Sequence, residues 1–170
     1  MAGLVATRAD MTTVRRVITR PSAAGGEDFD GVDDESFAQQ AKAGAFALWW
    51  RAHGLSYGIP WSELAPLKTG SDVLVNLSRS VLAEADALFP DTFHVFNITA
   101  PAAVLAERLA ARGREAPVDI ARRVARASAP LPDGLRVASI DNGGSLETAI
   151  AQASAILDTD WATTRSSQNV

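Results

Sequence analysis

The chain has 170 residues, enough for about one domain with a single core. Hydrophobic residues make up 47% and charged residues 21% of it, an ordinary globular composition, and the net charge of -4 argues against a nucleic-acid coat. The longest apolar run, 43–50, is far shorter than the roughly 20 residues of a membrane span, and 1–10 has no signal-peptide core. The sequence has no cysteine and therefore no disulfides. Together with the net charge and the short apolar run, this leads us to expect a cytoplasmic protein that binds neither nucleic acid nor membrane.

The first elements are expected around an acidic loop. Residues 14–18 are rich in β-branched side chains and predict a strand. Six carboxylates lie within 27–35, and they either hold Mg²⁺ or are simply solvated. The pattern of 36–43 predicts a helix that begins at Asp33 or Asp34 and ends at Gly44.

A hairpin is predicted next. Its strands are 45–52 and 55–59, joined through His53 and Gly54. Pro60 should then open a short helix that Pro66 interrupts. We expect the aromatic side chains of this stretch to be core residues, namely Phe46, Trp49 and Trp50.

From 72 onward strands alternate with helices, which predicts a mainly parallel α/β sheet. Ligands of such sheets bind at the carboxyl edge, where the polar residues Asn76, Ser78 and Arg79 should emerge. The expected strands are 72–76, 93–98 and 135–140, and the expected helices are 81–89, 101–112 and 145–157. The tail, 158–170, is expected to be loose.

Arginine supplies 14 of the 16 basic residues. Arg20 ends the first predicted strand, where its guanidinium either grips a phosphate or is an ordinary surface group. The arginines at 112, 114, 122, 123 and 126 outnumber Glu115 and Asp119, so an unpaired cationic surface remains. That surface either suits a polyphosphate or is a solvated helix face. Tyr57 either reaches a phosphate or completes the hairpin.

Several stretches are recognisable together: VITRPSAAGGED, DDESFAQQAKAGAFALWWRAHGLSYGIP, DVLVNLSR, LAERLAARGRE and ASIDNGG. They resemble the guanylate-kinase-like branch of nucleoside monophosphate kinases, and within it the ribose 1,5-bisphosphate phosphokinases of bacterial phosphonate metabolism. The resemblance implies a three-layer αβα P-loop kinase fold over 1–157, with an acceptor-binding insertion at about 27–59 and a lid at about 112–128. It also implies ATP and Mg²⁺ as cofactors and 5-phosphoribosyl 1-diphosphate as the product.

The resemblance assigns roles residue by residue. Arg20 and Tyr57 would hold an acceptor phosphate, beside the polar strand end described above. Arg112 and Arg123 would be catalytic residues of the lid. The ATP-binding residues would be Arg112, Arg114 and Asn142. Leu48 stands where guanylate kinases carry a guanine-binding glutamate, so guanine is an unexpected substrate.

One departure from the family is large. The sequence contains no G-x-x-x-x-G-K-[ST] loop, and 1–13 resembles the end of the helix that normally follows it. We therefore expect either a kinase that lacks its N-terminal strand and loop, or a non-catalytic binding module that holds a phosphorylated partner.

Overall fold

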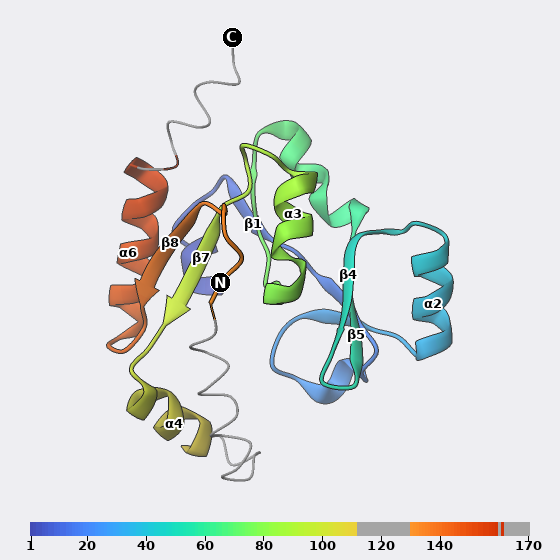
Figure 1. Cartoon of the computed structure of the whole chain (residues 1–170), viewed down its shortest axis with the longest axis horizontal. Coiled ribbons are helices and arrows are strands. Elements are labelled where there is room, and N and C mark those ends of the chain that lie inside the picture. Colours follow the sequence, from blue (N-terminus) through green and yellow to red (C-terminus); the bar gives the residue numbers. More distant parts are fainter. Residues whose placement is uncertain (112–129, 160, 162–170) are drawn as a thin grey trace. The chain divides into compact units, whose positions relative to one another are not determined.

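A computed structural model describes residues 1–111, 130–159 and 161. The chain forms two compact units, Met1–Leu88 and Phe89–Val170 (Figure 1). None of the helices in the described part of the chain has the length and hydropathy that a bilayer crossing requires.

The first unit begins with a short helix and a two-stranded parallel sheet. The helix α1 covers Ala2–Val5, and β1, Met11–Thr13, pairs with β6, Asp72–Leu74. Residues 1–13 are therefore helical only at their start, contrary to the prediction for 1–13. The reason is that β6 offers β1 a complete set of backbone partners, from Met11 opposite Asp72 to Thr13 opposite Leu74.

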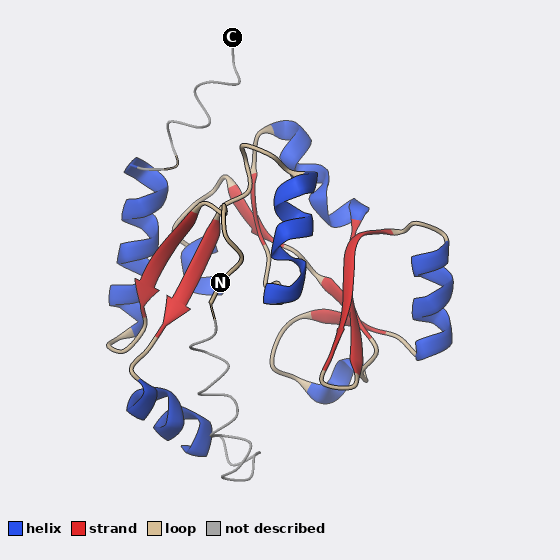
Figure 2. Ribbon diagram, viewed as in Figure 1, coloured by secondary structure: helices blue, strands red, loops and turns tan. Residues whose placement is uncertain are grey.

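A four-stranded sheet follows, in the order β3-β2-β5-β4. The strand β2 pairs in parallel with β3 and antiparallel with β5 (Figure 2). The strands are β2 Arg16–Ile18, β3 Phe29–Gly31, β4 Phe46–Ala52 and β5 Leu55–Pro60, and the 3₁₀ helix η1, Ser22–Ala24, lies between β2 and β3. The predicted strand 14–18 is thus shorter than expected, because the chain passes from one sheet to another between β1 and β2.

The hairpin of β4 and β5 is confirmed. Its two turn residues, His53 and Gly54, have φ angles of 54° and 75°. Two consecutive positive φ angles match the right-handed twist of a tight hairpin, which explains why a glycine occupies the second position. The turn therefore fixes the register in which Trp50 lies opposite Tyr57.

The helix α2, Asp34–Lys42, is confirmed as a capped amphipathic helix. The Asp33 carboxylate accepts a hydrogen bond from the Ser36 backbone N–H at 2.7 Å, and this bond lowers the pKa of Asp33. Phe37 of α2 packs with Phe46 and Val17 in a buried cluster. Trp50 is buried as predicted, but Trp49 is 47% exposed, because successive residues of β4 face opposite sides of the sheet.

Three short helices complete the first unit. They are η2 Trp61–Thr69, a 3₁₀ helix, η3 Arg79–Val81, also 3₁₀, and α3 Leu82–Leu88. Pro66 does not interrupt η2, contrary to the prediction. Its carbonyl still accepts hydrogen bonds from the Ser71 N–H and the Thr69 hydroxyl, and the turn ends at Gly70, whose φ is 79°.

The second unit contains the parallel strands β7 and β8, which lie side by side in Figure 1. The elements are β7 Val95–Thr99, α4 Ala102–Ala111, β8 Val137–Asp141 and α6 Leu146–Thr159. Ile140 is fully buried, and α6 buries one face with Ala149, Ala153 and Leu157. Beyond α6, Trp161 lies against Phe96 with 4.3 Å between ring centroids, so the beginning of the predicted tail is packed.

Candidate functional site

Arg20 lies just beyond β2, at the start of the loop that leads to β3. Its Nη2 donates to the Gly25 carbonyl at 3.0 Å, and its Cζ lies 4.3 Å from the centre of the Phe29 ring. Its Nε is buried and has no hydrogen-bond partner among the described residues. The guanidinium is thus held in place by an aromatic face and a carbonyl, and as a partly exposed cation it is suited to bind an anion.

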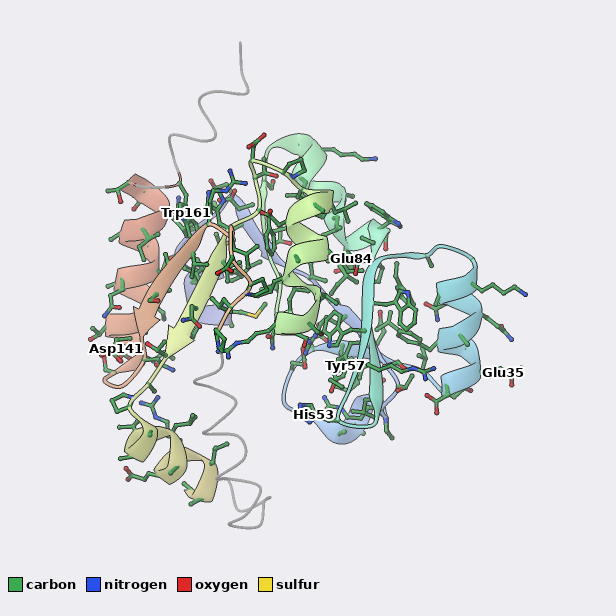
Figure 3. The ribbon with its side chains drawn as sticks, viewed as in Figure 1. Glu35, His53, Tyr57, Glu84, Asp141 and Trp161 are labelled. Atoms are coloured by element: carbon green, nitrogen blue, oxygen red, sulfur yellow. The ribbon has the colours of Figure 1, made fainter. Side chains whose placement is uncertain are left out.

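Arg20 and Tyr57 follow residues that hydrogen-bond to each other. The Thr19 N–H donates to the Ser56 carbonyl at 3.0 Å, and the Ser56 N–H donates to the Thr19 hydroxyl at 2.8 Å. Because β2 and β5 are antiparallel and Tyr57 lies opposite Ile18, Arg20 is two residues beyond the residue that pairs with Tyr57. Tyr57 lies on β5, away from the hairpin end marked by His53 in Figure 3.

Arg16, which the sequence analysis did not single out, contacts two of the predicted site residues, Tyr57 and Asn76. It is only 6% exposed, and its Nε and Nη2 donate to the two carboxylate oxygens of Glu27. Its Nη1 donates to the Asn76 carbonyl at 3.0 Å, and its Cζ lies 5.3 Å from the Tyr57 ring centre. The available signal was a charged residue beside Val17 and Ile18 in an apolar strand.

The polar residues after β6 make different contacts. Asn76 is joined through its carbonyl to Arg16, which also lies against Tyr57, so the structure brings these predicted residues together. The Ser78 side chain caps η3 and lies 2.9 Å from the Ser80 hydroxyl. Arg79 is the first residue of η3.

The acidic loop is occupied by internal contacts. Arg15 lies 2.8 Å from the Asp30 carboxylate and 3.6 Å from that of Asp28, Glu27 pairs with Arg16, and Asp33 caps α2. Within residues 1–111, 130–159 and 161, no group of three or more His, Cys, Asp or Glu side chains could hold a metal ion. Most of these carboxylates are thus paired with arginines or with a helix cap, and Mg²⁺ binding by one or two of them stays a prediction.

In the second unit, Asn142 lies in a turn after β8. Arg108 of α4 donates to the Asn142 carbonyl at 2.6 Å and to the Gly144 carbonyl at 3.0 Å, while the Asn142 N–H donates to Thr99. Figure 3 marks the start of this turn at Asp141. The turn is thus held from two elements. The predicted lid residues Arg112, Arg114 and Arg123 lie outside the described residues.

The chain is similar to several known proteins. No protein-family model matches the chain. The chain is 48% identical over 164 residues to the ribose 1,5-bisphosphate phosphokinase PhnN of Ruegeria sp. (strain TM1040), covering 95% of this chain and 85% of the relative. It is 48% identical over 151 residues to the protein of the same name from Rhizobium etli (strain CIAT 652), covering 89% and 76%.

A solved structure agrees at the level of the fold. The guanylate kinase of Anaplasma phagocytophilum superposes with a TM-score of 0.71 at 20% identity, covering 96% of this chain and 84% of that one. The predicted α/β, guanylate-kinase-like fold is confirmed. Together with the two close relatives, this shows that the chain belongs to the ribose 1,5-bisphosphate phosphokinase family, a family of phosphotransferases.

Proposed function

We propose that the chain binds ribose 1,5-bisphosphate as a phosphoryl acceptor, and that the reaction is transfer of the ATP γ-phosphoryl group to give 5-phosphoribosyl 1-diphosphate in phosphonate breakdown. The observation that carries the proposal is that predicted acceptor residues come together: Tyr57 lies opposite Ile18, two residues before Arg20. The guanidinium of Arg16 contacts both the Tyr57 ring and the Asn76 carbonyl. The names of the relatives supply the sugar phosphate.

The acceptor would be held by charge and hydrogen bonds. Arg20 is only partly buried, so the accessible part of its guanidinium would donate charge-assisted hydrogen bonds to an incoming phosphate. The Tyr57 hydroxyl would donate to the same phosphate. The sugar side of the site would be lined by residues that follow β6, namely Asn76, Ser78 and Arg79.

The apolar residue Leu48 argues against a nucleobase as part of the acceptor. Leu48 of β4 is 3% exposed and apolar, so it offers no hydrogen-bond acceptor to a guanine edge. A sugar phosphate has no base, so an apolar residue at this position deprives it of no hydrogen bond. The substitution therefore favours ribose 1,5-bisphosphate over a guanine nucleotide.

The chemical step would be an in-line displacement. An oxygen of the acceptor 1-phosphate forms a bond to the γ-phosphorus, the bond to the bridging oxygen breaks, and ADP leaves with that electron pair. Arg112 and Arg123 would neutralise the charge that develops, and Arg114 and Asn142 would contact ATP. Mg²⁺ would accompany ATP as the second cofactor, since it needs only one or two protein carboxylates when phosphates and water supply the other ligands.

A binding module is the second candidate function. It is favoured by one observation, the lack of G-x-x-x-x-G-K-[ST] in the 170 residues. Because that loop positions ATP, a polypeptide of these 170 residues should turn over at least about 10³-fold more slowly than one that carries the loop, the lower end of what one arginine finger contributes. The acceptor site would then bind its sugar phosphate without transferring a phosphoryl group to it.

Calorimetric titration of the chain with ribose 1,5-bisphosphate tests the proposal. We expect binding that Arg20→Ala weakens about 10-fold or more, as for loss of a charge-assisted hydrogen bond, while GMP fails to bind. The control is Arg51→Ala, which removes an exposed arginine from β4 of the same sheet and should leave the Kd unchanged. Absence of binding to the wild-type chain would refute acceptor recognition. Formation of ADP and 5-phosphoribosyl 1-diphosphate distinguishes the kinase from the binding module.

A further inference from the structure

Arg16 is a charged side chain inside the first unit. Its side chain is 8% exposed, and it lies on β2 between β3 and β5. A buried guanidinium is tolerated only when its donors are paired. Here Nε and Nη2 form a two-pronged pair with Glu27, and the Nε bond is 3.0 Å long. The ion pair therefore connects the loop between Arg20 and β3 to β2, the strand that precedes this loop.

The same guanidinium contacts two other segments. Its Nη1 donates to the carbonyl of Asn76, 60 residues further along the chain. Its Cζ lies 5.3 Å from the Tyr57 ring centre and 5.9 Å from that of Trp50, and those two rings stack 5.3 Å apart at 6°. One cation thus meets the loop after Arg20, the ring of Tyr57 and the chain at Asn76.

We propose that Arg16, with Glu27 as its counter-ion, is the positioning residue of the acceptor site. It sets the relative places of the Arg20 loop, the Tyr57 ring and the segment after β6, and it acts through them. This inference rests on the proposed function, since it takes the same residues as the acceptor site.

The geometry favours positioning over direct binding of the substrate. Glu27 covers the Nε and Nη2 edge with both carboxylate oxygens, and Asn76 takes Nη1. With 8% of the side chain exposed, little of the guanidinium is left for a phosphate. Glu27 is itself 35% exposed, so the carboxylate and not the guanidinium is the member of the ion pair that faces solvent.

The test compares Arg16→Met, Arg16→Lys and Glu27→Gln by calorimetry with ribose 1,5-bisphosphate. Arg16→Met and Glu27→Gln should each weaken binding about 10- to 100-fold, as when a group that orients ligand-binding side chains is lost. Arg16→Lys keeps the charge without the fork and should recover part of the loss. The double variant should be no worse than either single variant, because the two side chains act as a unit.

The neighbouring pair of Arg15 and Asp30 is the matched control. It joins the residue before β2 to β3, with 2.8 Å between Nη2 and the carboxylate, but the two side chains are 48% and 54% exposed. Arg15→Met should change the Kd by less than about 2-fold, as expected of an exposed ion pair. If Glu27→Gln binds like the wild type while Arg16→Met does not, Arg16 acts on the anion directly and the inference is overturned.

Hydrogen exchange separates this inference from the proposed function. Without any ligand, Glu27→Gln and Arg16→Lys should raise amide exchange about 10-fold in 20–31 and 75–78 and leave α2 unchanged. Unchanged exchange in both segments overturns the inference, whatever the chain binds. Raised exchange in a chain whose wild type binds no ribose 1,5-bisphosphate supports the positioning role and refutes the proposed function. Both variants retain a polar side chain, so folding is preserved better than in Arg16→Met.

Discussion

Gly31 is the residue at which one methyl group should disturb the Arg20 loop most directly. It ends β3, and its N–H donates to the Ser22 hydroxyl at 3.0 Å. A Cβ built there would lie 2.4 Å from the Arg20 carbonyl oxygen and 2.6 Å from both the backbone N and the hydroxyl of Ser22. Two of these three atoms are backbone, so relief requires the chain around 20–22 to move.

The cost of Gly31→Ala follows from these contacts. Overpacking of this kind costs about 1–3 kcal/mol, and loss of the hydrogen bond to Ser22 adds about 1 kcal/mol. We therefore expect a loss of about 2–4 kcal/mol of unfolding free energy, which at a slope of about 2 kcal/mol per molar lowers the urea midpoint by about 1–2 M. Because Arg20 moves with its carbonyl, sugar-phosphate binding should weaken as well.

The assay is urea unfolding followed by circular dichroism, with Gly144→Ala as the matched control. A Cβ at Gly144 would have no heavy atom within 4 Å, so its unfolding free energy should change by less than about 0.5 kcal/mol. A Gly31→Ala chain with the wild-type midpoint would refute the reasoning. So would an equal loss in the two variants, since the cost would then not come from the contacts at Arg20 and Ser22.

Three further outcomes are expected. Gly58→Ala places a Cβ 2.7 Å from the buried Phe46 ring and should cost about 1–3 kcal/mol in the same urea assay. The hydrogen bond that lowers the pKa of Asp33 contributes its full stability above the ordinary value of 3.8 and loses it as pH falls through the lower folded value. Melting curves should therefore show the wild type losing stability relative to Asp33→Asn only in that acidic range. Arg108→Met removes two bonds to the turn of Asn142, so amide exchange in 141–145 should rise, and an unchanged rate would contradict the role given to Arg108.

Elements governed by local chemistry could be predicted from the sequence. The pair His53 and Gly54 supplies two positive φ angles, and the hairpin of β4 and β5 has the predicted position. The cap of α2 is equally local, because the Asp33 carboxylate accepts a hydrogen bond from the free backbone N–H of Ser36. These features depend on neighbours in sequence, so no knowledge of the tertiary structure was needed.

Features that depend on distant partners could not be predicted. Strand β3 has three residues, F-D-G, and shows no periodicity of its own; it forms because β2 lies beside it. Arg15 and Arg16 look alike in sequence, yet their side chains are 48% and 8% exposed, because Arg15 precedes β2 whereas Arg16 is the first residue of this strand, which is buried between β3 and β5. The pairing of Arg16 with Glu27 likewise needed the structure, whereas Arg20 and Tyr57 came from the resemblance. The lid arginines stay a prediction.

The packing of Trp161 has a practical consequence for spectroscopy. The chain has four tryptophans, and the other three, at 49, 50 and 61, belong to the first unit. Trp161 therefore reports on the second unit alone, with its ring 4.5 Å from that of His94 and 4.3 Å from that of Phe96. Replacing the other three by phenylalanine would leave a single emitter, and its red shift during denaturation would follow the opening of the second unit separately from the rest of the chain.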